Sequence, residues 1–153
     1  LEMRIFRAVA VALVGLTLGL SLSACTATIN LDAAELANDP ACAEIIVRLP
    51  EEVALLPIRN TNAQATAAWG EPTAVILRCG LEPADVSALP CVTAGDVDWL
   101  VDDSQKPSYR FITFGRKPAT EVIVDSTAVA GVSALEAVAG AIQNIKATER
   151  CLG

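Results

Sequence analysis

The sequence predicts an α+β domain, in which an antiparallel, meander-like sheet of four strands is flanked by an N-terminal and a C-terminal helix and stapled by two disulfides. Apolar residues recur at helical spacing near both ends of the chain, which predicts the helices. Between them lie short β-branched and aromatic segments separated by turn-forming residues, which predict the strands. Five cysteines and a length of 153 residues favour one stapled domain.

Residues 1–24 are predicted to be a lipoprotein signal peptide, in which Met3 is the expected start and Leu1 and Glu2 are not native. Two arginines precede an apolar run over residues 8–20. A helix that crosses a bilayer needs about 20 apolar residues, so this run is too short for a permanent span. It is typical of the hydrophobic part of a secretory signal.

The segment Leu22-Ser23-Ala24-Cys25 matches the bacterial lipobox, whose cysteine thiol accepts a diacylglyceryl group. The alternative is an ordinary secretory signal followed by a chance cysteine. Lipidation at Cys25 predicts a protein anchored on the outer face of the cytoplasmic membrane, since two or more acyl chains hold a protein stably. Residues 25–38 are then a tether, and residues 39–153 a single extracytoplasmic domain. The net charge of −7 argues against nucleic acid and leaves the tethering to the lipid.

The N-terminal helix is predicted to begin at Asp39-Pro40, where aspartate caps and proline suits the first turn. Its apolar stripe has helical spacing, and Pro50 is expected to end it. The stripe consists of Cys42, Ile45, Ile46 and Leu49. Residues 51–69 are weakly patterned, with a short buried turn at 53–56 and a polar loop at 59–62.

The four strands are predicted at residues 73–79, 97–101, 109–114 and 121–125. The turn-like segments 102–107 and 115–118 separate the last three. Connections this short require antiparallel neighbours.

The C-terminal helix is predicted from the capping box Ser133-x-x-Glu136 and from the apolar stripe behind it. That stripe consists of Leu135, Val138, Ile142 and Ile145. Lys146 and Arg150 are expected at its end, where cations suit the helix dipole. We expect both helices on one face of the sheet.

The four cysteines other than Cys25 are expected to form disulfides, and they allow three pairings. Cys79 and Cys91 are close in sequence and flank a proline-containing segment, which favours pairing them with each other. Cys42 and Cys151 would then tie the start of the domain to its end. A free reactive thiol is the alternative.

Several short motifs together resemble the actinobacterial lipoproteins grouped as the domain of unknown function family 3515. They are the lipobox, Asp39-Pro40-Ala41-Cys42, Ala68-Trp69-Gly70-Glu71-Pro72, Leu77-Arg78-Cys79-Gly80, Cys91, Val97-Asp98-Trp99 and Thr113-Phe114-Gly115-Arg116 with Pro118. The resemblance covers nearly all of residues 40–125. It implies a Gram-positive-type envelope with the domain outside the cytoplasmic membrane, and it brings no activity or catalytic residue.

The sequence contains no histidine, which excludes Ser-His-Asp and Cys-His catalysis and any metal site that needs imidazole. No cofactor is predicted. Trp69 is either an aromatic platform for a ligand or a plug at the end of the sheet, and the plug is favoured. Trp99 alternates with two valines and is expected in the core.

Arg78, Arg110 and Arg116 are candidate binding residues, because guanidinium groups on adjacent strands suit a carboxylate or phosphate. The favoured alternative is cross-strand pairing with Asp98 and Glu121. The turn at residues 115–118 is the most basic point after the leader and the expected contact for an anionic surface or partner. The nearby acids are expected in a solvated turn rather than a calcium site. They are Asp96, Asp98, Asp102 and Asp103.

These observations favour a non-enzymatic envelope accessory with an envelope protein as its partner. A binder of a small anionic or sugar-like ligand, using Trp69 and the arginines, is the second hypothesis. The third is a carboxylate-based hydrolase, which needs two acids facing one cleft with one pKa raised.

Overall fold

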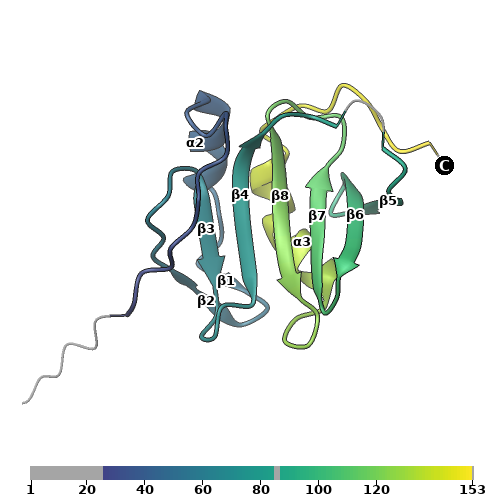
Figure 1. Cartoon of the computed structure of the whole chain (residues 1–153). Helices are drawn as coiled ribbons and strands as arrows, with labels where there is room; N and C mark the ends of the chain where they lie inside the picture. The colour runs from purple at the N-terminus through teal and green to yellow at the C-terminus, as the bar shows by residue number, and fades with distance from the viewer. Residues whose placement is uncertain (1–25, 85–86, 153) are drawn as a thin grey trace, which may run out of the picture.

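The computed structural model describes residues 26–84 and 87–152, so the predicted signal peptide and Cys25 lie outside the described residues. These residues form an antiparallel sheet with helices on one face (Figure 1). The α+β class is confirmed, but the sheet has eight strands rather than four, in the order β1-β2-β3-β4-β8-β7-β6-β5.

All four predicted strands are present, with longer or shifted bounds. They are β4 (Val75–Leu81), β6 (Val97–Gln105), β7 (Ser108–Thr113) and β8 (Ala119–Asp125). Only part of their order is a meander. After β4 the chain crosses to the far edge of the sheet, and it then returns strand by strand until β8 pairs with β4.

The other four strands were not predicted. They are β1 (Glu52–Val53), β2 (Leu56–Arg59), β3 (Thr66–Trp69) and β5 (Cys91–Ala94). Each has two to four residues, too few to display an alternation. The expected turn at 53–56 joins β1 to β2 through Ala54 and Leu55, whose φ angles are 49° and 67°. Tight turns with positive φ angles usually contain glycine or asparagine, which makes them predictable from sequence, and this turn contains neither.

Helix α2 (Pro40–Ile46) begins as predicted, because the side chain of Asp39 accepts a hydrogen bond from the Ala41 amide at 2.8 Å. It ends before the predicted Pro50. Helix α3 (Gly131–Ile142) has Ala130 as its N-cap and no side-chain cap, so the predicted capping box is wrong.

The predicted ends of α3 also need correction. Ser133 and Glu136 lie inside the helix, and Lys146 and Arg150 follow its last residue. The apolar stripe is nevertheless buried, with Ile145 just beyond the helix. No helix among residues 26–84 and 87–152 is long and apolar enough to cross a membrane.

The main core lies between the sheet and the two helices, which contact each other. Trp69 and Trp99 are both fully buried in it. The indole nitrogen of Trp69 donates to the Pro50 carbonyl at 3.1 Å, and that of Trp99 donates to the Ala94 carbonyl at 3.2 Å. The prediction of Trp99 in the core is confirmed. Trp69 is the last residue of β3 and is fully buried, so it cannot serve as a ligand platform.

The disulfides join Cys42 to Cys79 and Cys91 to Cys151, so the predicted pairing is wrong. Cys79 lies in β4, beside α2, whereas Cys91 begins β5 at the far edge of the sheet. Three strands separate these two cysteines, although only a short crossover joins them in sequence. Each disulfide therefore fastens a terminal part of the domain to the strand beside it.

Residues 27–37, expected to be part of a tether, instead pack along the sheet, and we call them the N-terminal strap. Ile29 forms a parallel bridge with Thr61, and the Leu36 amide donates to the Gly80 carbonyl at 2.7 Å. A Cβ on Gly80, which has φ +108°, would lie 2.4 Å from the Ala37 nitrogen. Only glycine permits so close an approach. Figure 1 shows the strap beside β3 and β4.

Candidate functional site

Arg78, Arg110 and Glu121 form one group on the sheet face opposite the helices, which we call the sheet-face cluster. Glu121 is opposite Arg78 in the β4–β8 register and is only 1% exposed. Arg78 Nε donates to Glu121 Oε1 at 2.7 Å, and Arg110 Nε donates to Oε2. For these two arginines the predicted cross-strand pairing with Glu121 is confirmed.

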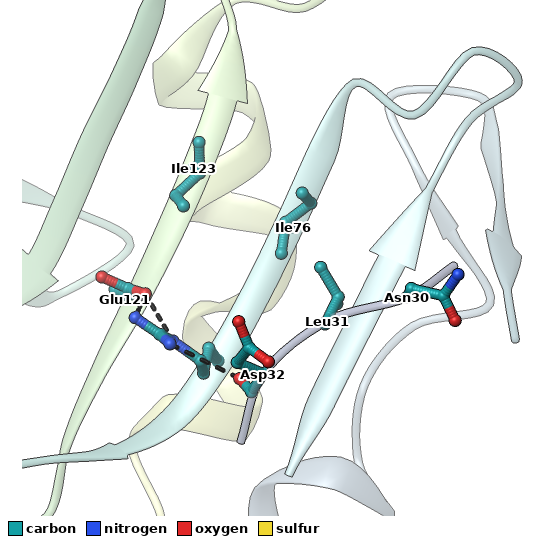
Figure 2. A pocket seen from close by; sticks show the side chains of 7 residues that line it. Asn30, Leu31, Asp32, Ile76, Glu121 and Ile123 are labelled. Carbon is teal, nitrogen blue, oxygen red and sulfur yellow. Dashed lines mark hydrogen bonds and ion pairs between the residues drawn. The ribbon is translucent and has the colours of Figure 1, made fainter. Parts of the chain in front are cut away.

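A shallow hollow of about 250 Å³ adjoins the sheet-face cluster (Figure 2). Ile76 and Ile123 from the sheet and Asn30, Leu31 and Asp32 from the N-terminal strap line it. The Asp32 carbonyl accepts a hydrogen bond from Arg78 at 3.4 Å. Arg78 therefore already has a buried carboxylate and a carbonyl as partners, and the cluster joins β4, β7, β8 and the strap.

Arg116 does not join the other two arginines. It lies in the turn that joins β7 to β8, is 4% exposed, and donates to the Ile145 carbonyl. Its Nε is buried without a hydrogen-bond partner among the described residues. The turn at residues 115–118 was expected as a basic contact, and this is wrong for Arg116, which the segment after α3 covers, whereas Lys117 in the same turn is exposed. The Thr148 amide donates to the Gly115 carbonyl at 2.7 Å and fixes that cover in place.

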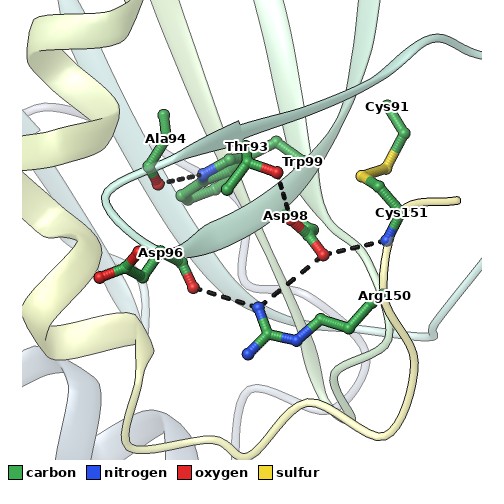
Figure 3. Close-up of a disulfide and its surroundings, with 8 residues drawn as sticks. All are labelled: Cys91, Thr93, Ala94, Asp96, Asp98, Trp99, Arg150 and Cys151. Atoms are coloured by element: carbon green, nitrogen blue, oxygen red, sulfur yellow. Dashed lines mark hydrogen bonds and ion pairs between the residues drawn. A yellow bond between two sulfur atoms is a disulfide. The ribbon is translucent and has the colours of Figure 1, made fainter. Parts of the chain in front are cut away.

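Asp98, the other predicted arginine partner, lies between Thr93, Arg150 and the disulfide of Cys91 and Cys151 (Figure 3). Its carboxylate accepts from Thr93 Oγ1 at 2.6 Å and from the Cys151 amide at 3.0 Å, and Arg150 lies 3.8 Å away. Burial alone would raise the pKa of Asp98. The two hydrogen bonds and the charges of Arg150 and Arg116 outweigh burial and lower it.

A second hollow, of about 390 Å³, lies between the β5–β6 turn and the segment that follows α3, and we call it the C-terminal hollow. It is lined by Asp96, Arg116, Gln143, Lys146, Ala147 and Arg150. The disulfide between Cys91 and Cys151 holds the end of this segment against β5. Three cations, one from the turn between β7 and β8 and two from the segment after α3, thus line one depression.

Neither Lys146 nor Arg150 was predicted as a site residue. Both were placed at the end of a longer helix, where cations are common for a purely structural reason. The chain leaves the helix at Ile142 instead, and the following residues fold over the turn that contains Arg116. No pattern in the sequence predicts that the residues after α3 fold back over this turn.

The four acids expected in a solvated turn do not share one, because Asp96 lies between β5 and β6 whereas the other three lie in β6. For Asp98, which is 5% exposed, the expectation of a solvated position is wrong. Within residues 26–84 and 87–152, no group of three or more acidic or cysteine side chains is placed to hold a metal ion. Asp102 instead accepts a hydrogen bond from the Ser104 amide at 3.0 Å. Hydrogen bonds from Ser104 and the charge of Arg110 lower the pKa of Asp102.

Comparison with known proteins identifies the family. A family model described as "Protein of unknown function (DUF3515)" matches residues 5–150. The chain belongs to the DUF3515 family. The resemblance inferred from the short motifs is therefore confirmed at the level of the family. No curated protein and no solved structure matches this DUF3515 chain.

Proposed function

We propose that this DUF3515 protein is a lipid-anchored, non-catalytic accessory of the cell envelope, held on the outer face of the cytoplasmic membrane. In this proposal Cys25 carries the lipid, and the folded domain acts on a protein partner in or beside the membrane. The lipobox over residues 22–25 supports the anchor, and the packing of the N-terminal strap supports the place of action.

The observation that carries the proposal is the small number of residues between Cys25 and the first residue that is hydrogen-bonded to the folded domain. The Ala27 carbonyl accepts a hydrogen bond from Arg59 Nη2 at 3.0 Å. Arg59 is itself buried, donates to the Gly70 carbonyl at 2.9 Å and pairs with Glu71. Ala27 is thus attached to a fixed point of the sheet rather than to a free linker.

Only Thr26 lies between Cys25 and this attachment. Two residues span at most about 7 Å. A lipid on Cys25 would therefore hold the sheet edge almost against the bilayer surface and limit how far the domain can reach. Such a tether suits a protein that works on a membrane-proximal partner.

One observation argues against the hydrolase alternative, because a carboxylate mechanism needs one acid with a raised pKa. The carboxyl groups of the described residues whose pKa clearly shifts are Asp98, Asp102 and Asp125, and in all three the pKa is lowered. Burial of Trp69 removes the platform on which the sugar-binding hypothesis depended.

The anchor is tested with Cys25→Ser in cells that process lipoproteins. We expect this variant to lose acyl labelling and to move from the membrane fraction to the medium. Thr26→Ala, one residue away, retains the thiol and should stay in the membrane fraction. Equal membrane retention of the Cys25→Ser variant would contradict the proposal.

The place of action is tested with a 20-residue Gly/Ser spacer inserted between Thr26 and Ala27. The spacer keeps the lipid but lets the domain leave the surface. Cross-linking in intact cells should capture a membrane-proximal partner with the native chain and lose it with the spacer. The same spacer after Leu152 is the control and should preserve the cross-link. A cross-link that survives both insertions equally would show that nearness to the membrane is irrelevant.

A further inference from the structure

The C-terminal hollow differs from the rest of the charged surface in having cations without matching acids. Among residues 26–84 and 87–152, every lysine and arginine except two has a carboxylate within ion-pair distance. The two exceptions are Arg116 and Lys146, and both line the C-terminal hollow. Arg150, which shares a carboxylate at 3.8 Å, lines it as well.

Arg116 is the buried hydrogen-bond donor among the residues that line the hollow. The side chain is 4% exposed, and its Nε has no hydrogen-bond partner in the described part of the chain. Burial, and then the nearby charge of Arg150, lower the pKa of Arg116, while the charge of Asp98 opposes them only in part. Arg59 is also buried, but Glu71 lies within ion-pair distance of it. A buried guanidinium with no carboxylate at ion-pair distance is costly unless an anion approaches it.

The geometry points to a phosphate group as the missing anion, and we propose that the C-terminal hollow binds a phosphate or phosphate ester. Three cationic groups reach the hollow from the turn at Arg116 and from two positions after α3. Such separated donors suit the several oxygens of a phosphate, whereas the two oxygens of a carboxylate need only one planar guanidinium. With Asp96 and Asp98 nearby, the group keeps one excess positive charge for the ligand.

The size and rigidity of the hollow suit this ligand. Its volume of about 390 Å³ exceeds that of a bare phosphate and leaves room for the group that carries it. The Gln143 side chain donates to the Gly95 carbonyl at 2.8 Å, and Arg150 Nη1 donates to the Asp96 carbonyl at 3.3 Å. These bonds join the segment after α3 to the β5–β6 turn and fix the two walls. The disulfide between Cys91 and Cys151 fastens the same segment covalently.

The hollow lies at the β5–β6 edge, whereas the strap leaves the sheet at β2 (Figure 1). With neighbouring strands spaced by about 4.8 Å, the five spacings from β2 to β6 place these two regions roughly 25 Å apart. Phosphate occurs both in soluble esters and in lipid headgroups, so the test must separate the two sources. The proposal does not depend on lipidation at Cys25, and either idea can fail alone.

The test is calorimetric titration of the full chain in a neutral detergent, with inorganic phosphate as the probe. Glycerophosphoglycerol, a soluble headgroup diester, is the second probe, and acetate is the carboxylate control. Lys146→Gln removes an exposed cation that lines the hollow. Lys106→Gln makes the same change at the other end of β6, about 30 Å away.

We expect phosphate to bind saturably and more tightly than acetate. Lys146→Gln should weaken phosphate binding about tenfold or more, as expected when one charge-assisted hydrogen bond is lost. Lys106→Gln should leave it unchanged, and both variants should unfold at the native temperature without ligand. Stronger binding of the diester would assign the site to lipid headgroups. No saturable binding of either phosphate, or equal loss in both variants, would overturn the proposal.

Discussion

The sheet-face cluster and the C-terminal hollow contain the same kinds of side chain but use them differently. On the sheet face, one buried carboxylate, Glu121, joins two arginines from neighbouring strands. At the C-terminal edge, Asp98 has one arginine at 3.8 Å, while Arg116 and Lys146 have no carboxylate within ion-pair distance among the described residues. The first group is complete and structural. The second is open to an added anion.

The difference shows that an arginine cluster is not a binding site by composition alone. Arg78 and Arg110 were predicted as candidate binding residues, yet their guanidinium groups already share Glu121. What distinguishes the C-terminal hollow is a buried cation, Arg116, that has no carboxylate within ion-pair distance among the described residues. Breaking each group separately tests this distinction.

The largest effect is expected from Glu121→Gln. The substitution preserves shape but leaves Arg78 and Arg110 without their shared charge. Removing one partner of a buried ion pair costs about 3–5 kcal/mol. Because the two arginine side chains are 32% and 38% exposed, water offsets part of this cost, and we expect a loss of about 2–3 kcal/mol. Urea unfolding of the full chain in detergent measures it.

The matched control is Glu44→Gln, which makes the same substitution in an exposed pair with Arg48 on α2. Surface pairs of this kind contribute about 0.5 kcal/mol or less. If the two variants lose similar stability, Glu121 is not the centre of a structural cluster. The comparison with the C-terminal hollow would then fail.

A second, smaller effect is expected from Arg116→Met. The variant loses a hydrogen bond to the Ile145 carbonyl but also removes a buried charge that lacks a carboxylate. These changes oppose each other, so we expect the free energy of unfolding to change by no more than about 1 kcal/mol. Phosphate binding should be lost in the same variant. A destabilisation as large as that of Glu121→Gln would mean that Arg116 is as well compensated as the sheet-face arginines.

The sequence predicts the long elements better than the short ones. Strands β4, β6, β7 and β8 have six to nine residues and show a pattern, and α2 has an aspartate cap followed by proline. Strand β3 is Thr-Ala-Ala-Trp, buried along its whole length, so no polar alternation marks it. The crossover after β4 also leaves no local signal, because strand order depends on pairings between distant segments.

Of the predicted arginine contacts, the sequence predicts correctly only those made by residues that face each other on neighbouring strands. Arg78 opposite Glu121 follows from the pairing of two adjacent strands. The burial of Arg116 depends on residues 143–152, which return over its turn after α3 has ended. The disulfide pairing failed for the same reason, since Cys91 lies close to Cys79 in sequence but at the opposite edge of the sheet. The spacing of residues along the sequence does not predict contacts between segments that fold back onto distant parts of the sheet.

The smallest effect concerns the pH dependence contributed by Asp98, the buried carboxylate that lies 3.8 Å from Arg150 beside the C-terminal hollow. Its hydrogen bonds and neighbouring arginines lower its pKa in the folded state relative to about 3.9 in the unfolded chain. A lowered pKa stabilises the fold above the unfolded value, and this contribution is lost as pH falls through the folded value. Each unit of lowering is worth about 1.4 kcal/mol.

Asp98→Asn isolates this contribution, because asparagine keeps the shape but does not titrate. Between pH 6 and pH 3 the native chain should lose more stability than the variant in urea unfolding. The exposed acids with lowered pKa values, Asp102 and Asp125, are present in both chains and cancel in the difference. Identical slopes would mean that neither the hydrogen bonds from Thr93 and Cys151 nor the charges of Arg150 and Arg116 lower the pKa of Asp98. The two arginines would then have no effective interaction with Asp98, which would sharpen the contrast with Glu121.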